Sequence, residues 1–352
     1  MVEYLSGGRV QGSSTSASSP PQTSFKFLKR AILTSAGDTI TTSTFTAKDN
    51  MQILTFGLAS GNIEAALQVG NGSIDTGSNY SVRWEVNGTN GTGIDKTSID
   101  TNHTASGNEF VTYDIVNVAD QEKLVIAELV DSAGTGVDNA PNRVEHVGKW
   151  ANTSAQINIV QAKNVGGGSF DTGSEIVVLG CDNDEADTGS NFWQELAIGT
   201  ASGGSLTSGT FTAKKYLMVV TNLNASTNSA CSYQFNDDTG ANYNTRYNED
   251  GGTDGTWKLT GALPIGRAQG SNSPSYQVSY IVNKSDQEKL TISEDVSNKA
   301  GTGVGNAPQR QETVGKWANT SAQITKINIV DSQGISNTPW LAGSTIKVYG
   351  AD

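Results

Sequence analysis

The chain has 352 residues, a formal net charge of −12 and a pI near 4.6, and this length leaves room for two domains of ordinary size. Its 40 glycines and its 16% of charged residues fit neither a helical bundle nor a charged disordered tail, and they favour short strands joined by many turns. The negative charge repels phosphate backbones and anionic lipids, so we expect neither nucleic acid nor membrane as a partner.

Residues 1–24 predict an extended N-terminal arm. Residues 13–24 contain mainly Ser, Thr, Ala and Gln with the pair Pro20-Pro21, a composition that cannot form a core of its own. Residues 1–9 lack the charged and apolar regions of a secretory signal, and no run of about 18 apolar residues follows. We therefore expect a chain without signal peptide or membrane span, whose arm orders against a neighbour in an assembly.

A sequence repeat divides the rest of the chain. Residues 120–124 (Asp-Gln-Glu-Lys-Leu) return at 286–290, and residues 133–141 return at 300–308 with Asp138 replaced by Gly305. Residues 148–157 (Gly-Lys-Trp-Ala-Asn-Thr-Ser-Ala-Gln-Ile) return unaltered at 315–324. An offset of 166 or 167 residues indicates a domain duplication, so we predict a first domain over 25–181, an acidic linker over 182–190 and a second domain over 191–352.

Short apolar stretches separated by Asn-Gly, Thr-Gly and Ser-Gly steps predict β-strands in each domain. The cations of residues 26–30 alternate with Phe25, Phe27 and Leu28 as in a half-buried strand, although an anionic-ligand patch is the alternative. Further strands are expected at 52–58, 80–86, 110–116, 123–129, 156–160 and 175–179. Seven or eight strands per domain predict an all-β chain of two tandem antiparallel β-sandwiches of jelly-roll type.

The repeated segment contains Trp150 and Asn152, with Trp317 and Asn319 as their copies. One interpretation is a ligand platform, since Trp and Asn suit stacking on and hydrogen bonding to a sugar. The other is structural, with each Trp plugging a corner of the core as it leads into a strand, and with turn chemistry from Asn-Thr-Ser. We favour the structural interpretation.

The sequence gives little support for a set of catalytic residues. Asp75-Thr76-Gly77 and its counterpart at Asp238 superficially resemble the Asp-Thr-Gly of aspartic proteases, but Gly, Ser and Asn surround them instead of an apolar cleft. His103 and His146 have no counterparts in the second half, so no repeated Ser-His-Asp set or histidine metal site is indicated. We expect no enzyme and no cofactor.

Calcium is a weak exception to that expectation. Asp182, Asp184 and Asp187 in the linker, and Asp250 and Asp254 around a Gly-Gly turn, offer the oxygen ligands that a hard cation needs. Neither group has EF-hand spacing, and solvated acidic loops are the alternative. Cys181 and Cys231 do not occupy equivalent positions, so no disulfide framework is repeated.

Residues 148–157, followed by residues 173–180 (Gly-Ser-Glu-Ile-Val-Val-Leu-Gly) and preceded by the opening residues 6–14 (Ser-Gly-Gly-Arg-Val-Gln-Gly-Ser-Ser), resemble structural proteins of tailed viruses, many known from marine metagenomes. The resemblance implies a virion component. From the missing signal we expect synthesis in the host cytoplasm, and we expect the chain to assemble with itself, as a homo-oligomer, and with other virion proteins. Capsid decoration or vertex protein, head fibre and tail component all remain open.

Two other classes of function stay open. A carbohydrate-binding or receptor-binding module would expose aromatic side chains, for which the unrepeated Trp84, Trp193, Trp257 and Trp340 are the candidates. A self-assembling filament or surface-layer subunit would use the same sandwiches and donate its N-terminal arm to the next protomer.

Overall fold

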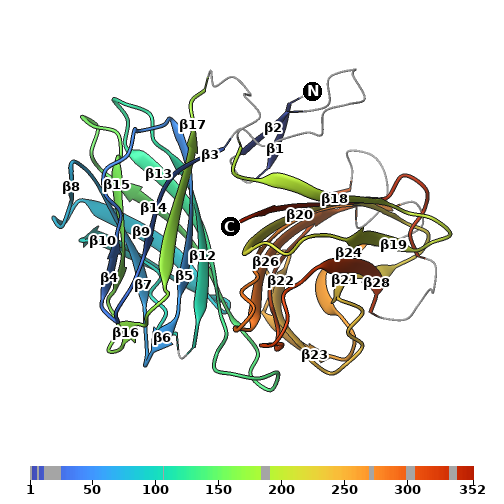
Figure 1. Ribbon diagram of the computed structural model, residues 1–352. Helices are drawn as coiled ribbons and strands as arrows, with labels where there is room; N and C mark the ends of the chain where they lie inside the picture. The colour runs from blue at the N-terminus through green and yellow to red at the C-terminus, as the bar shows by residue number, and fades with distance from the viewer. Residues whose placement is uncertain are drawn as a thin grey trace. The chain divides into compact units, whose positions relative to one another are not determined.

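The computed structural model describes residues 2–5, 8–11, 25–105, 107–183, 191–268, 273–298, 306–332 and 339–352, and every regular element in them is a β-strand. The described residues contain no helix long and apolar enough to cross a membrane. The chain divides into two compact units (Figure 1). The predicted all-β fold with two tandem antiparallel sandwiches is confirmed.

The first unit contains an eight-stranded and a five-stranded antiparallel sheet among its described residues. The larger sheet has the order β10 (Thr89–Lys96), β9 (Tyr80–Val86), β14 (Asn142–Trp150), β13 (Lys123–Asp131), β12 (Glu109–Val116), β5 (Asn50–Gly57), β17 (Glu175–Cys181), β3 (Lys26–Ile32). The smaller sheet has the order β11 (Ile99–Asp100), β7 (Ala65–Asn71), β15 (Ile159–Asn164), β4 (Thr39–Thr41), with β8 (Ser73–Ile74) beside β7. Two short strands, β6 (Ala59–Ser60) and β16 (Ser169–Phe170), pair with each other.

The second unit repeats this plan with an eight-stranded and a four-stranded sheet in its described residues. The larger sheet has the order β18 (Gln194–Thr200), β29 (Thr345–Ala351), β20 (Tyr216–Ala225), β25 (Ser273–Val282), β26 (Lys289–Ser297), β27 (Gln309–Trp317), β22 (Tyr243–Glu249), β23 (Gly255–Leu259). The smaller sheet has the order β19 (Leu206–Thr210), β28 (Lys326–Asp331), β21 (Ser229–Phe235), β24 (Leu263–Ala268).

Strand periodicity builds the two cores. Successive side chains of a strand point to opposite faces of its sheet, so alternate residues of β12 and β13 face the smaller sheet. Val111 and Leu129 of the large sheet share one buried cluster with Leu67 and Val160 of the small sheet. In the second unit, Val219 of the large sheet shares a buried cluster with residues of β21 and β28 in the same way. Each unit is therefore a two-layer sandwich with a core of its own.

In both units a fully buried asparagine joins the same three backbone segments. Asn117, after β12, donates from Nδ2 to the carbonyl oxygens of Lys48 (2.9 Å) and Ile157 (3.1 Å) and accepts the amide of Ile157 (2.6 Å) on Oδ1. Asn283, after β25, makes the corresponding bonds to Lys214 (2.9 Å) and Ile324 (3.1 Å, and 2.6 Å from the amide). The side chain thus satisfies three backbone groups that strand pairing leaves open.

The strand predictions were mostly right, with two corrections. Residues 156–158 are not in a strand, and β15 begins at Ile159. Trp150 ends β14 instead of leading into a strand, because the side chain of Asn152 accepts the amides of Ser154 (2.8 Å) and Ala155 (3.0 Å) and so forms a turn.

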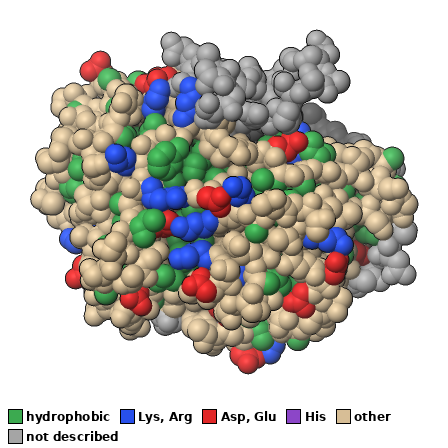
Figure 2. Space-filling model, viewed as in Figure 1, with side chains coloured by type: hydrophobic (Ala, Val, Ile, Leu, Met, Phe, Trp, Pro, Cys, Tyr) green, Lys and Arg blue, Asp and Glu red, His purple; other side chains and the backbone are tan. Residues whose placement is uncertain are grey.

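The basic stretch at residues 26–30 lies on β3, an edge strand of the large sheet. Phe27 and Ile32 on this strand are 51% and 48% exposed. Figure 2 shows Lys and Arg side chains lying among hydrophobic ones on the visible face of the first unit. Charged side chains on an edge strand oppose pairing with another sheet edge.

The boundaries of the compact units differ from the repeat boundaries. The first unit comprises Met1–Gly134 and Asn142–Trp193, and the second comprises Thr135–Pro141 and Gln194–Asp352. Trp193 groups with the first unit because its Nε1 donates to Oε1 of Gln52 (3.0 Å) in a buried contact. Linker residues 184–190 and arm residues 12–24 lie outside the described residues, whereas β1 (Val2–Leu5) and β2 (Gly8–Gln11) form an antiparallel pair that we did not predict.

Replacing Asn283 with Ala should lower the free energy of unfolding of the second unit by about 3 kcal/mol, because three backbone groups lose their buried partner. The same change at Asn117 should destabilise the first unit by a similar amount. Urea denaturation followed by far-UV circular dichroism measures both changes. Asn90→Ala, at an exposed position of β10, is the control, and equal stability of all three variants would refute the proposed role of the asparagines.

Candidate functional site

The repeated tryptophans are buried at equivalent corners of the two units. Trp150 and Trp317 are 2% and 1% exposed. Nε1 of Trp150 donates to Oδ2 of Asp75, and Nε1 of Trp317 donates to Oδ2 of Asp238, each at 2.7 Å. Because protein atoms cover the indole faces, these rings are not available to stack on a ligand.

The Asp-Thr-Gly segments serve this same corner. Oδ1 of Asp75 accepts the amide of Gly77 (2.8 Å), and Oδ2 accepts Nδ2 of Asn79 (2.9 Å). Desolvation raises the pKa of Asp75, but the hydrogen bonds from Trp150, Gly77 and Asn79 together lower that pKa below its usual value. The carboxylate is thereby fixed as a hydrogen-bond acceptor within a turn.

A lysine completes each corner. Nζ of Lys123 donates to the carbonyl oxygen of Asn152 (3.0 Å) and lies 6.0 Å from the ring centroid of Trp150. Nζ of Lys289 donates to the carbonyl oxygen of Asn319 (2.8 Å), and burial lowers the pKa of Lys289 to about 8. The four residues singled out in the repeated segment therefore lie in two copies of one structural arrangement.

The unrepeated tryptophans divide into two kinds. Trp193 and Trp340 are 1% and 2% exposed. Trp84 on β9 and Trp257 on β23 are half-buried. A Cβ at Gly91 would collide with the ring of Trp84, so Trp84 covers the glycine opposite it on the edge strand. Packing within the sheet therefore accounts for the presence of Trp84 at this position.

The weak calcium candidates have protein partners where the structure describes them. Oδ2 of Asp182 accepts Nζ of Lys48 (2.8 Å), Oδ1 of Asp250 accepts the amide of Arg310 (3.0 Å), and Oδ1 of Asp254 accepts Nδ2 of Asn248 (3.0 Å). Asp184 and Asp187 lie outside the described residues. Within the described ranges no group of three or more His, Cys, Asp or Glu side chains is arranged to hold a metal ion. Calcium binding stays an untested prediction.

A buried acidic cluster in the first unit escaped the sequence analysis. Nε2 of His103 contacts Oδ2 of Asp131, which also accepts Nδ2 of Asn142 (3.0 Å). Glu109 is fully buried, and desolvation, with the nearby charge of Asp131, raises its pKa well above the usual value. His103 and Asp131 lie 28 residues apart in the sequence, so no local sequence pattern signals the cluster.

Polar groups fill part of the interior of the second unit at positions that are apolar in the first. Ser279 Oγ contacts Ser293 Oγ (2.9 Å) and the hydroxyl of Tyr233 (3.0 Å). Asp295 accepts Oγ of Ser275 (2.5 Å) and the amide of Arg267 (3.4 Å). Burial raises the pKa of Asp295 to about 7 despite these bonds.

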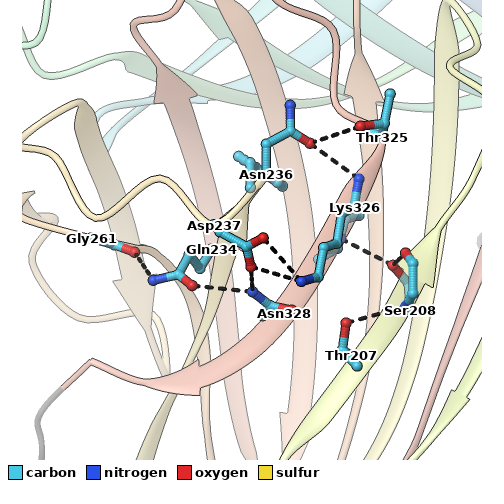
Figure 3. A network of polar contacts seen from close by, with 12 residues as sticks. Thr207, Ser208, Gln234, Asn236, Asp237, Gly261, Thr325, Lys326 and Asn328 are labelled. Carbon is cyan, nitrogen blue, oxygen red and sulfur yellow. Dashed lines mark hydrogen bonds and ion pairs between the residues drawn. The ribbon is translucent and has the colours of Figure 1, made fainter.

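The outer face of the four-stranded sheet carries a polar network that Figure 3 shows in detail. Nζ of Lys326 lies 2.9 Å from Oδ1 of Asp237, and Nδ2 of Asn328 donates to that oxygen (2.7 Å) and to Oε1 of Gln234 (3.1 Å). The hydrogen bond from Lys326, followed by that from Asn328, lowers the pKa of Asp237. These bonds link β21 to β28 across an exposed surface.

The outer face of the large sheet of the first unit is apolar where β12, β13 and β14 meet. Val116, Leu124, Ile126 and Val147 are 44%, 56%, 62% and 49% exposed. Val116 pairs with Leu124, and Ile126 pairs with Val147, so the four side chains lie on one face in adjacent rows. Exposed apolar patches of this kind mark interaction surfaces.

The corresponding face in the second unit has a different environment. Val282, Leu290, Ile292 and Val314 occupy the same rows and are each at most 2% exposed. The segment Thr135–Pro141 belongs to this unit. It connects β13 to β14 in the chain and forms hydrogen bonds with residues of this face.

No protein-family model and no curated protein matches the chain. Among solved structures, domains LG4-5 of the mouse laminin alpha1 chain align with 91% of this chain and 89% of that chain, at 8% identity and a TM-score of 0.15. Human GIVD cytosolic phospholipase A2 aligns with 77% of this chain and 33% of that chain, at 8% identity and a TM-score of 0.14. Scores this low carry no argument about fold or function.

Replacing Asp295 with Asn should change how stability depends on pH. Between its ordinary pKa of 3.8 and its folded pKa of about 7, the carboxyl group is protonated when folded and ionised when unfolded. The folded state therefore binds more protons, and the contribution of Asp295 to stability falls as pH rises through this window, by at most about 1.4 kcal/mol per pH unit. Urea unfolding at several pH values should show this slope in the wild type and lose it in Asp295→Asn; an unchanged slope would contradict the assignment.

His146 should produce the opposite slope in the first unit. It is fully buried, and desolvation lowers its pKa from 6.5 to about 4, so between these values the unfolded state binds the extra proton. Stability should fall as pH drops through this window. His146→Leu should remove the loss, which amounts to about 2 kcal/mol at pH 5. Hydrogen exchange of β13 and β14 peptides at pH 5 and pH 8 tests this, with pH 8 as the condition at which no such difference is expected.

Proposed function

We propose that the chain is a non-enzymatic structural protein that acts by assembling with other protein molecules, as a component of the virion of a tailed virus. The observation that carries the assembly part is the apolar outer face formed by Val116, Leu124, Ile126 and Val147. Leaving such a surface in water costs about 25 cal/mol per Å² of apolar area relative to burying it, so a protein partner would stabilise it.

The roles of the repeated residues support a structural protein. The most similar stretches of the two repeats form the Trp-Asp-Lys corners and the buried asparagine crossings, which are parts of the scaffold. The Asp-Thr-Gly carboxylates act there as acceptors for indole and amide groups. Placing the chain in a virion rests on the resemblance of its repeated segments to tailed-virus structural proteins.

The carbohydrate-binding alternative has weaker support. It calls for exposed aromatic rings, whereas Trp193 and Trp340 are buried and Trp84 covers a glycine within its own sheet. The ring of Trp257 lies next to that of Tyr247, with centroids 4.5 Å apart and the planes tilted by 41°, and the guanidinium of Arg267 lies 5.5 Å from the Trp257 centroid. Its ring is therefore engaged by protein groups.

Immunogold electron microscopy with antibodies against the recombinant chain tests the virion assignment. Tailed particles from lysates that carry this gene should be labelled on the head or the tail at fixed positions. Particles purified from a lysate without the gene are the control. Label found only on cellular filaments or on cell surfaces would contradict the proposal and favour the filament or surface-layer alternative.

A further inference from the structure

We infer that the apolar outer face of the first unit binds residues 300–308 of a second copy of the chain, so that copies join head to tail. This inference rests on the assembly function proposed above, and it identifies the partner. The acceptor face is defined here as Arg83, Leu124, Ile126, Val147 and Lys149, with Glu122 beside it. The donor segment is residues 300–308.

The two large sheets present the same outer rows. In the first unit Leu124 lies opposite Lys149, and Ile126 lies opposite Val147, which in turn pairs with Arg83. The second unit has the same residue types in the same register: Leu290 opposite Lys316, Ile292 opposite Val314, and Arg246 beyond Val314. The acceptor face of the first unit is therefore a near copy of the face in the second.

The face in the second unit shows what such a surface binds. Nδ2 of Asn244 donates to the carbonyl oxygen of Val137 (2.7 Å), and Nε of Arg246 donates to that of Pro141 (2.8 Å). The amide of Gly136 donates to Oε1 of Glu288 (2.6 Å). All three contacts use the backbone of Thr135–Pro141, so any segment with the same backbone path can make them.

The chain holds one other copy of that segment. Residues 133–141 read Ala-Gly-Thr-Gly-Val-Asp-Asn-Ala-Pro, and residues 300–308 read Ala-Gly-Thr-Gly-Val-Gly-Asn-Ala-Pro. Residues 299–305 lie outside the described part, but Asn306, Ala307 and Pro308 are exposed, whereas Pro141 is buried. The second copy of the segment is thus presented to solvent at its described end.

The groups that receive the segment are also in place on the first unit. Arg83 corresponds to Arg246 and is exposed. Nζ of Lys149 lies 3.0 Å from Oε2 of Glu122, and the corresponding Lys316 and Glu288 lie 3.8 Å apart. Arg83 can therefore donate to a backbone carbonyl oxygen as Arg246 does, and Glu122 can accept a backbone amide as Glu288 does.

The single difference between the two segments is matched by a difference between the two faces. Asp138 forms an ion pair with Lys258, which lies opposite Asn244 in the β22–β23 register. Gly305 replaces Asp138 in the second segment. Ser81 takes the place of Asn244 in the first unit, since it lies opposite Lys149 as Asn244 lies opposite Lys316. The position opposite Ser81 on β10 falls in the register shift between Gly93 and Lys96, where the sequence reads Ile94-Asp95. Residues 300–308 lack a counterpart of the Asp138 carboxylate, and neither Ile94 nor Asp95 is a counterpart of Lys258, so both partners of the Asp138–Lys258 ion pair are replaced together.

Two variants of the full chain separate the two halves of the contact. The acceptor variant carries Ile126→Glu and Val147→Glu, at side chains 62% and 49% exposed, and the donor variant carries Val304→Glu and Pro308→Glu. Ile198→Glu, at a 50% exposed position of β18, is the matched control. Sedimentation velocity or mass photometry across a concentration series up to about 100 μM measures association, because a contact of micromolar strength is well populated there.

The wild type and the control should grow beyond dimers as concentration rises, and each variant alone should associate at least about tenfold more weakly. An equimolar mixture of the two variants should form dimers and stop there, because it contains one working donor and one working acceptor. Persistent monomers of the wild type, variants that associate like the control, or a mixture that remains monomeric would each overturn the inference. Serine at the same four positions repeats the test if a glutamate variant loses its far-UV spectrum.

The two proposals fail separately. Immunogold label on virions together with a strictly monomeric wild-type chain would refute the head-to-tail contact and leave the virion assignment standing. Growth of the wild type and dimers in the mixture without label on virions would refute the virion assignment and leave the contact standing.

Discussion

The two-residue period of the β-strand is the constraint on which the rest of this structure depends. Each large sheet must give one face to its own core, and its other face is then free to become a surface. A shift of register by one residue would exchange the two faces. The buried side chains of Asn117 and Asn283 oppose such a shift, because each joins the end of one strand to backbone groups in two segments that lead into other strands.

The two faces have diverged differently between the repeats. On the inner face, Val111 and Leu129 of the first unit are paired opposite each other, and Gln277 and Asp295 take their places in the second. The polar pairs in the second unit are hydrogen-bonded, so the interior tolerates them. On the outer face the rows of Leu, Ile, Val, Lys and Arg are kept. The interior is therefore free to vary as long as it is filled and satisfied, while the outer rows are held to one pattern within this chain.

The fold class was predictable because short strands and turn residues are local signals, and because the internal repeat can be read directly from the sequence. One part of the tryptophan corners was predictable, because the repeat singled out Trp150 and Trp317. Their partners were not, because only the folded chain brings Asp75 and Asp238 to the indole nitrogens. The contact between His103 and Asp131, and the placement of Thr135–Pro141 in the second unit, depend on distant parts of the chain. The outer apolar face had a sequence signal, since residues 124–126 read Leu-Val-Ile and are apolar at both alternate positions, as in a strand with two apolar faces.

A segment that binds a face different from itself makes a heterologous contact, and such contacts propagate until geometry closes them. In a tandem repeat the number of segments equals the number of faces. The segment and face already joined in the second unit account for one of each, and the proposed contact between copies uses the other segment and the other face. Under this proposal every added copy offers the next copy the same segment and the same face. The rotation between successive copies would decide whether the result is a ring or a filament. The hydrogen bonds proposed between copies would fix that rotation more tightly than apolar contact alone, because hydrogen bonds are directional.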